Sequence, residues 1–435
     1  MQIQKPRPNY KLVKSSFGKY EEIPEDWYIT TISDFTSSHK QGFYTDQPYS
    51  NSGVRLIRIS DMHNPKISYE TMPFLELDDR TLKQFSVSKG DVLFARSGAA
   101  IGTFGIVDEN IRAVFASYLI RFTFNPKIIN NNYFGYVYSS FYVLKQQNII
   151  RQGSSNININ AENIKSIKVI LPPLPEQQKI TSILSNVDSL IQLAQNELEQ
   201  TQRLKKGLMQ KLLTNGIEHT ESQKVRLFPR YSKELIPKSW KMDKLGNLLQ
   251  IIDYRGRTPP FSKEGIPHLR SNNIRDGMIN LEEITYVSEQ TYNEYMTRGI
   301  PKENDVLFTT EGPLGEVALV PPNFKFSLAQ RIMILRPKSK KINPQFLKYL
   351  LLDRKVRIRY MGLATGTTLG GIASKWFTKI LLPYPEDISE QETIANTLLC
   401  VEKQIVQQQG YKSKLDNLKK GLMQKLLTGQ IRVKV

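Results

Sequence analysis

The sequence is poor in the residues that build metal sites and disulfides. It has one cysteine, Cys400, and four histidines, His39, His63, His219 and His268. A single cysteine cannot form an internal disulfide, and histidines this scattered do not have the spacing of a zinc site. We therefore expect no structural metal.

Long apolar runs are also missing. No stretch reaches the roughly 18 apolar residues that a membrane-spanning helix needs. The first residues, MQIQKPRPNYKLVKSS, have no apolar core of the kind found in signal peptides. The sequence predicts a cytoplasmic protein with no membrane partner.

Motifs of catalysis are absent as well. There is no G-x-x-x-x-G-K-[ST] loop, which excludes a P-loop NTPase. The run Thr258-Pro259-Pro260-Phe261 is similar to the motif of amino-methyltransferases but lacks the amide or acid that would accept a hydrogen bond from the target amine. Acidic pairs such as Asp78-Asp79 are typical of solvated loops. We expect no catalytic residue, no bound metal and no cofactor in this chain.

Positive charge is what the chain has in excess. It carries 60 Lys and Arg against 41 Asp and Glu over 435 residues, a net charge of +19. A compact chain gains nothing from self-repulsion, so this charge favours a polyanionic partner, with nucleic acid ahead of an anionic membrane. Hydrophobic residues make up 40% of the chain, which is enough for real cores and excludes a disordered protein. The length allows two or three domains.

The chain is a tandem duplication. Residues 204–214 and 418–428 both read LKKGLMQKLLT, at an offset of 214 positions. The same offset relates Asp91-Val92-Leu93-Phe94 to Asp305-Val306-Leu307-Phe308. Residues 24–170 and 237–380 agree mainly in apolar framework, whereas the ends of the repeats are identical. The two large segments are therefore expected to have different functions on one scaffold, and the two short segments the same function. Recent gene conversion is the alternative explanation of the identity.

Each copy begins with a mixed α/β segment. In copy one, residues 54–59, 91–94 and 114–124 are rich in β-branched and aromatic residues, which predicts strands. Residues 132–148 have the apolar spacing of an amphipathic helix, which recurs at residues 346–351. A last strand is predicted at 164–171.

A long helix follows each α/β segment. Apolar residues recur in steps of three and four, which is typical of a coiled-coil seam. The seam residues are Ile180, Leu184, Val187, Ile191, Ala194, Leu198, Leu204, Leu208 and Leu212 in copy one, and Ile394, Leu398, Val401, Ile405, Leu415, Leu418, Leu422 and Leu426 in copy two. Ser389 and Glu392 are predicted to form a capping box, and Gly216 and Gly429 to end the helices.

The predicted fold class is α+β, with two mixed α/β domains separated by two long antiparallel coiled-coil helices in a dumbbell with pseudo-twofold symmetry. The predicted divisions of the sequence are a lead segment 1–23, a first α/β domain 24–175, a helical region 176–214, a linker 215–236, a second α/β domain 237–388 and a second helical region 389–435.

Basic, amide and hydroxyl side chains gather in turns of the α/β segments. Arg reads guanine, Asn and Gln read adenine, and hydroxyl groups hold phosphate. The candidate DNA-binding residues of copy one are Arg55, Arg58, Arg96, Ser97, Arg112, Arg151, Gln152, Ser154, Ser155 and Asn156. Those of copy two are Arg255, Arg257, Thr258, Arg270, Asn272, Asn273, Thr310, Arg331, Arg357, Arg359, Thr367, Thr368 and Lys375. For any single residue an ordinary surface charge is the alternative, but recurrence after equivalent strands favours DNA.

The identical helix ends are the candidate partner-binding surface. The residues concerned are Lys206, Gly207, Met209 and Lys211 in copy one, and Lys420, Gly421, Met423 and Lys425 in copy two. Glycine inside a helix costs about 1 kcal/mol relative to alanine. Close approach of another backbone would offset this cost, either from the opposite helix or from a bound subunit.

These motifs together resemble the specificity subunits of type I restriction-modification systems. The resemblance rests on the duplication, the Arg-Ser-Gly-x-x-x-Gly turn at 96–102, the GSS and GTT turns at 153–155 and 366–368, the LPPLPEQQKI run at 171–180 and the LMQKLLT helix ends. Copy two departs from the pattern, with Pro383-Tyr384-Pro385 in place of Leu-Pro-Pro-Leu-Pro.

The resemblance implies that residues 24–175 and 237–388 are target-recognition domains, each reading one half of a split, asymmetric site in double-stranded DNA. It also implies that the helical regions bind two methyltransferase (modification) subunits. S-adenosylmethionine, ATP and Mg²⁺ would then be used by partner subunits, including restriction (translocase/endonuclease) subunits, and not by this chain.

Two other functions remain open from the sequence. One is a self-contained DNA methyltransferase or nuclease, against which the missing motifs argue. The other is a coiled-coil structural adaptor, which has no use for a net charge of +19 or for two divergent α/β domains. Weak, salt-insensitive DNA binding would favour the adaptor.

Overall fold

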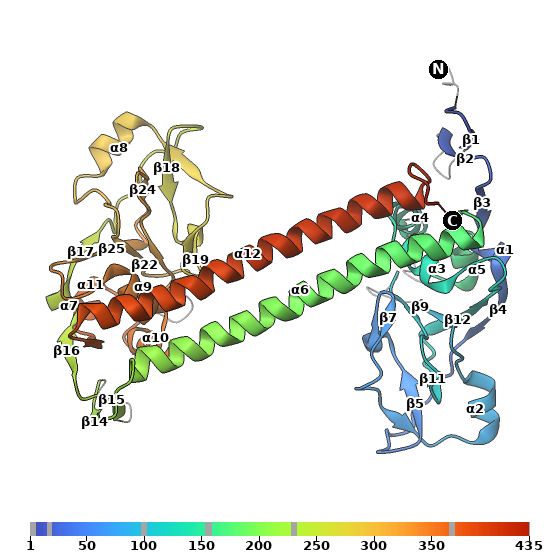
Figure 1. Cartoon of the computed structure of the whole chain (residues 1–435), viewed down its shortest axis with the longest axis horizontal. Helices are drawn as coiled ribbons and strands as arrows, with labels where there is room; N and C mark the ends of the chain where they lie inside the picture. The colour runs from blue at the N-terminus through green and yellow to red at the C-terminus, as the bar shows by residue number, and fades with distance from the viewer. Residues whose placement is uncertain are drawn as a thin grey trace. The chain divides into compact units, whose positions relative to one another are not determined.

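The computed structural model describes residues 6–14, 20–96, 102–152, 159–227, 233–364 and 370–434. The chain forms two compact units: unit 1 contains Met1–Gln195 and Tyr411–Val435, and unit 2 contains Asn196–Gly410. Two long helices, α6 (Leu174–Asn215) and α12 (Ile388–Leu427), contribute residues to both units (Figure 1). Within the described ranges, no helix is both long and apolar enough to cross a membrane.

Unit 1 contains two main sheets, several two-stranded sheets and a layer of helices. The first sheet is antiparallel, in the order β10 (Phe104–Ile106), β9 (Val92–Ala95), β12 (Leu119–Phe124), β4 (Thr36–Gln41). The second has the order β11 (Ala113–Phe115), β5 (Val54–Ile57), β8 (Phe74–Leu75), and β11 pairs with β5 in parallel. β3 (Tyr28–Thr31) pairs with β13 (Lys168–Leu171), and β1 (Tyr10–Lys14) with β2 (Tyr20–Pro24). The helices are α1 (Ile32–Phe35), α2 (Asp79–Phe85), α3 (Asn131–Tyr138), α4 (Phe141–Gln152) and α5 (Ala161–Lys165).

Unit 2 repeats this order of elements. Its antiparallel sheet is β17 (Leu249–Asp253), β25 (Ile332–Pro337), β22 (Val306–Thr309), β23 (Val317–Leu319). Its second sheet is β21 (Thr285–Val287), β18 (Ile266–Leu269), β24 (Ser327–Leu328), again with one parallel pair, β18 and β24. β16 (Trp240–Lys244) pairs with β26 (Leu381–Pro385), and β14 (Ser222–Val225) with β15 (Glu234–Pro237). The helices are α7 (Leu245–Leu248), α8 (Glu289–Tyr295), α9 (Pro344–Leu352), α10 (Arg354–Met361) and α11 (Ser374–Phe377). The predicted α+β class and internal repeat are confirmed.

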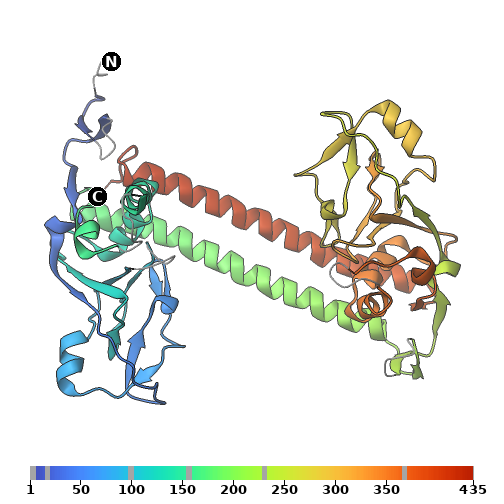
Figure 2. The same cartoon turned by 180° about the vertical axis from the view of Figure 1, so that it is seen from behind.

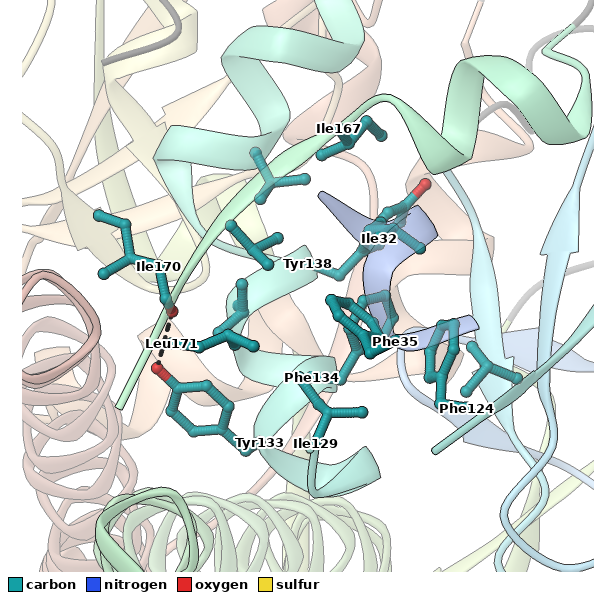
Figure 3. Packing of buried hydrophobic residues seen from close by; sticks show 14 of the residues in the cluster. Ile32, Phe35, Phe124, Ile129, Tyr133, Phe134, Tyr138, Ile167, Ile170 and Leu171 are labelled. Carbon is teal, nitrogen blue, oxygen red and sulfur yellow. Dashed lines mark hydrogen bonds between the residues drawn. The ribbon is translucent and has the colours of Figure 1, made fainter. Parts of the chain in front are cut away.

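The core of unit 1 joins the helical layer to the long helices. Phe134 of α3 packs edge-to-face against Phe35 and Phe124, with ring centres 6.1 and 4.7 Å apart (Figure 3). Tyr133 donates a hydrogen bond of 3.3 Å to the carbonyl of Ile170 in β13. The same cluster includes Leu184 of α6, and α3 lies beside α6 in both views of the chain (Figures 1 and 2).

A buried glutamine joins the start of each long helix to its α/β segment. In unit 1, Gln177 accepts a 2.8 Å bond from the main-chain N–H of Asn130 and donates bonds of 2.9 Å to the carbonyls of Ile128 and Pro172. In unit 2, Gln391 makes the same three bonds, with Asn343, Lys341 and Pro385, at 2.8–2.9 Å. Both glutamines have an exposed fraction of 0%. The departure of copy two from the Leu-Pro-Pro-Leu-Pro pattern therefore leaves this joint unchanged.

The long helices run antiparallel within each unit. In unit 1, Arg432, which follows the end of α12, bonds at 2.7 Å to the carboxylate of Glu176 at the start of α6. In unit 2, His219, which follows the end of α6, lies 2.8 Å from the carboxylate of Glu390 at the start of α12. A carboxylate is favourable at a helix N-terminus, and here it also fastens the end of the other helix.

Several predicted element bounds are wrong. The helix predicted at 132–148 is interrupted at Ser139 and Ser140, which separate α3 from α4. The strand predicted at 114–124 is two strands, β11 and β12, and the first part of the strand predicted at 164–171 belongs to α5. Apolar spacing alone does not show such short breaks, because it continues in phase on both sides of them.

Two predictions about the long helices are also wrong. α12 begins at Ile388, and the side chain of Asp387 accepts a 2.9 Å bond from the N–H of Ser389, so Ser389 is not the cap. Leu204 and Leu418 are 53% and 49% exposed and lie off the seam. Leu204 is six positions after Leu198, which is not a helical repeat. Gly216 and Gly429, with φ angles of +67° and +72°, do end the helices as predicted.

The glutamine joint predicts a selective loss of stability. Gln391→Leu would remove the partners of the buried carbonyl of Pro385 and of the partly buried N–H of Asn343 and carbonyl of Lys341, at about 1–3 kcal/mol for each group left uncompensated. We expect the free energy of unfolding of unit 2 to fall by about 2–5 kcal/mol in chemical denaturation of the full chain. The exposed Gln404 on the same helix is the matched control, and Gln404→Leu should change it by less than about 0.5 kcal/mol. Equal stability of the two variants would contradict the role of the joint.

Candidate nucleic-acid interface

The two units present equivalent main-chain positions at the end of their antiparallel sheets. In unit 1 the N–H of Arg96 bonds to the carbonyl of Tyr118 at 3.0 Å, and the carbonyl of Arg96 accepts from Ile159 at 2.8 Å. In unit 2, Thr310 makes the same pair of bonds, to Arg331 at 2.9 Å and from Ile372 at 3.0 Å. Arg96 thus corresponds to Thr310, and Tyr118 to Arg331. The backbones agree while the side chains differ in charge and shape.

The described candidate residues of unit 1 lie in different environments. Arg96 is partly exposed, and Arg112 is exposed. The guanidinium of Arg55 lies 5.3 Å from the centre of the Phe74 ring. Arg58 forms a 2.9 Å ion pair with the buried Asp61, which anchors it within the fold. Of these four candidates, Arg96 and Arg112 are therefore the ones for which no contact within the described part of the fold holds the guanidinium.

Other candidates of unit 1 cannot be placed. Ser97, Ser154, Ser155 and Asn156 lie outside the described residues, as do the side chains of Arg151 and Gln152 at the end of α4. In unit 2 the same holds for Thr367 and Thr368. Their predicted DNA contacts stay predictions.

Five candidates of unit 2 surround one hollow. A cup of about 360 Å³ is lined by Arg257, Thr258, Arg270, Asn272 and Arg331, together with residues that include Phe261 and His268. Arg257 donates a 3.0 Å bond to the hydroxyl of Thr297, and Arg270 a 3.3 Å bond to the carbonyl of Glu283. Three arginines and no aspartate or glutamate line this cup, so its lining is positively charged.

The remaining candidates of unit 2 serve the fold or lie elsewhere. Asn273 is 3% exposed and donates a 3.0 Å bond to the carbonyl of Asn280. Thr310 is fully buried, and Arg359, which is 3% exposed, forms a 2.9 Å ion pair with Glu234. These three side chains are not available at the surface of the free protein.

Three further candidate side chains of unit 2 make contacts within the fold that leave them partly accessible. Arg357 bonds to the carbonyl of Leu314 at 3.3 Å, and Arg255 bonds to the carbonyl of Ile372 at 2.9 Å. Lys375 is exposed, with its ammonium 5.5 Å from the centre of the Trp376 ring. None of the three lines the cup.

The sequence analysis missed the polar wall of the cup. His268 is 1% exposed, and its Nδ1 lies 2.8 Å from the hydroxyl of Ser327. Burial lowers the pKa of His268 to about 4, and the nearby positive charge of Arg270 acts in the same direction, so the imidazole is neutral at physiological pH. Aligning the repeats would have flagged it, because copy one has apolar residues at both equivalent positions.

The identical helix ends line an equivalent groove in each unit. In unit 2 a groove of about 800 Å³ is bordered by Lys206 and Met209 of α6. In unit 1 a groove of about 1060 Å³ is bordered by Lys420, Met423 and Lys425 of α12. A Cβ atom at Gly207 or Gly421 would meet no described atom within 4 Å, so no other backbone in the described part of the chain approaches them. Lys211, which does not line a groove, is exposed.

The described residues contain no group of three or more His, Cys, Asp or Glu side chains that could hold a metal ion. The features that the fold does assemble are a basic cup, partly exposed arginines and two matched grooves.

Comparison with known proteins places these features in a family. The model of the type I restriction modification DNA specificity domain matches twice, at residues 24–203 and 237–415. A candidate MjaX type I restriction enzyme specificity subunit from Methanocaldococcus jannaschii is 28% identical over 97% of this chain and 98% of its own length. The MjaVIII specificity subunit of the same organism is 27% identical over 95% of this chain and 94% of its own.

The fold is also that of a solved structure. The S subunit of a type I restriction-modification system from M. genitalium has a TM-score of 0.56 and 15% identity to this chain, covering 92% of this chain and 96% of that one. The repeat seen in the sequence and in the fold corresponds to the two matches of the specificity domain. The chain belongs to the type I restriction-modification DNA specificity family, with two specificity domains in tandem.

Proposed function

We propose that this chain is the sequence-specific DNA-binding subunit of a type I restriction-modification complex and that it is not itself an enzyme. The observation that carries the proposal is the uneven divergence of the two repeats. Exposed side chains at matched backbone positions differ, as Tyr118 and Arg331 do, whereas the surface at the helix ends is the same in both. A protein that reads two different sequences and binds one kind of partner twice requires this combination.

The DNA target in this proposal is split and asymmetric. Each unit reads one half-site of double-stranded DNA through the turns at the ends of its sheets. The net charge of +19 supplies the non-specific attraction to phosphate on which base reading is superimposed. Cytoplasmic location is part of the proposal, because the ligand is cellular DNA.

The partners in this proposal are two modification subunits and, with them, restriction subunits with translocase and endonuclease activity. Each groove has an apolar residue, Met209 or Met423, beside lysines, which suits a partner surface that is apolar with an acidic border. Leu204 and Leu418 lie in the same identical stretch and are about half exposed, so we add them to the partner surface. S-adenosylmethionine, ATP and Mg²⁺ bind in the partner subunits.

Exchange of one reader tests the DNA half of the proposal. Replacing residues 237–380 by the equivalent segment of another family member should change one half of the selected site and leave the other half unchanged, because each unit has its own core. The measurement is selection from a randomised duplex DNA library by the chain assembled with its modification subunits. Exchange of residues 24–170 is the reciprocal control and should change the opposite half.

A change in both halves after either exchange would count against independent readers. So would a selected motif that is palindromic in the natural protein.

Charge placed on the exposed leucines tests the partner half. Leu204→Glu and Leu418→Glu should each remove one bound modification subunit, and the double variant should remove both, because a carboxylate would be desolvated against an apolar partner surface. Native mass spectrometry of the purified complex measures the stoichiometry. Leu193 is 58% exposed on α6 but lies outside the identical stretch, so Leu193→Glu should leave two subunits bound.

The wild-type chain carrying a single modification subunit at saturation would contradict this assignment. Retention of both subunits by the double variant would contradict it equally.

A further inference from the structure

The cup of unit 2 is built over a buried pair that the sister unit lacks. His268 of β18 lies opposite Ser327 of β24 in a parallel register. The equivalent strands of unit 1, β5 and β11, place Leu56 opposite Val114. Main-chain bonds fix this correspondence: Ala329 donates to Leu269 at 2.8 Å, and Ala116 donates to Ile57 at 3.0 Å. One scaffold therefore accepts either an apolar or a polar pair at this point.

A polar pair here stabilises the fold less well than an apolar one. His268 is 1% exposed and Ser327 is fully buried, so the hydrogen bond between them has to compensate for the burial of both polar groups. Burial of polar groups is costly unless they are fully hydrogen-bonded. Leu56 and Val114 show that packing alone does not require His268 and Ser327. Because His268 lines the cup, a role of this polar pair in binding a ligand there explains its presence.

Arg331 differs from the other arginines of the cup in how it is held. Its Nε donates a 2.9 Å bond to the carboxylate of Glu311, and neither of its terminal nitrogens donates a hydrogen bond to any described residue. Arg257 and Arg270 instead use a terminal nitrogen for bonds within the fold. Glu311 thus fixes the orientation of Arg331 through Nε, and the two terminal nitrogens of Arg331 are left to bind a ligand.

The neighbouring carboxylate distinguishes a base from a phosphate as the ligand. Glu311 and Arg331 are 40% and 47% exposed, so a phosphate bound by Arg331 would approach an exposed negative charge. A guanine edge carries no net charge and offers two acceptors, O6 and N7, which match two donors of one guanidinium. Glu311 therefore opposes a phosphate contact and permits a base contact.

We propose that the cup of unit 2 is a guanine-reading site, in which Arg331 contacts the base, Glu311 positions Arg331, and His268 with Ser327 forms the polar wall that sets which base edge fits. This inference rests on the proposed function and specifies it for one half-site. In unit 1 the equivalent of Arg331 is Tyr118, which is 58% exposed and carries no positive charge. The half-site of unit 1 accordingly has no guanine preference from this position.

The experiment is selection from a randomised duplex DNA library by the full chain assembled with its modification subunits. Arg331→Ala should reduce the preference for guanine at one position of one half-site by about ten-fold or more, and leave the other half-site unchanged. Arg331→Lys keeps the positive charge but not the two parallel N–H donors of a guanidinium, so it should lose the same preference. Arg275→Ala, at an exposed arginine of the same unit outside the cup, is the matched control and should keep every preference.

Two further variants test the positioning residue and the wall. Glu311→Ala should weaken the same guanine preference, and Glu311→Gln should restore part of it, because an amide oxygen still accepts from Nε. The double variant His268→Leu with Ser327→Val installs the residues of unit 1. It should unfold at a temperature no lower than that of the wild type, yet alter base preference at the position read by the cup.

The possible outcomes distinguish a failure of the proposed function from a failure of the guanine site. If the wild-type complex selects no sequence at all, the proposed function fails. If it selects a two-part site but Arg331→Ala and Arg331→Lys retain every preference, the guanine site is wrong and the proposed function stands. A uniform loss of affinity for all sequences in Arg331→Ala, restored by Arg331→Lys, identifies a phosphate contact and also overturns the inference.

Discussion

The buried glutamine at the start of each long helix is the interaction on which the organisation of each unit depends. Gln177 and Gln391, which are fully buried, bond to an N–H and a carbonyl in the segment that enters α3 or α9 and to the carbonyl that follows or ends the last strand. Each α/β segment is thereby fixed to the helix that follows it. The strands that carry Arg96 and Thr310 at their ends, β9 and β22, pack against α3 and α9 through Phe94 and Phe308.

Divergence and identity of the repeats follow from this arrangement. Main-chain hydrogen bonds set the backbone at the strand ends, so the exposed Tyr118 of unit 1 can be replaced by Arg331 in unit 2 without moving the backbone. The helix ends have no such freedom if they bind the same subunit twice. This explains why Leu204 and Leu418 are both leucine although both are about half exposed, where burial does not require leucine.

Most of the fold could be predicted from the sequence, because a repeat of this length shows which features are structural. The two α/β segments, the long helices and their glycine ends follow from periodicity and turn chemistry. The break at Ser139 and Ser140 does not, because the apolar pattern continues across it. Leu204 was placed on the seam by its residue type, although its distance from Leu198 puts it on another face.

The candidate site was less predictable than the fold. Arg58, Asn273 and Arg359 have the residue types of DNA readers but are held by Asp61, Asn280 and Glu234 within the fold. Conversely, His268 and Glu311 are functional candidates only because of their neighbours, Ser327 and Arg331. Residue type gives the chemistry that a side chain can perform, and only packing shows whether it is free to perform it.

A map of methylated bases in the DNA of a cell that carries this chain with its modification subunit tests directly whether the two units read two different half-sites. This arrangement predicts one motif made of two different specified blocks separated by unspecified base pairs, and no such methylation when this chain is removed. Methylation of a palindromic or uninterrupted motif, or methylation that persists without this chain, would contradict it.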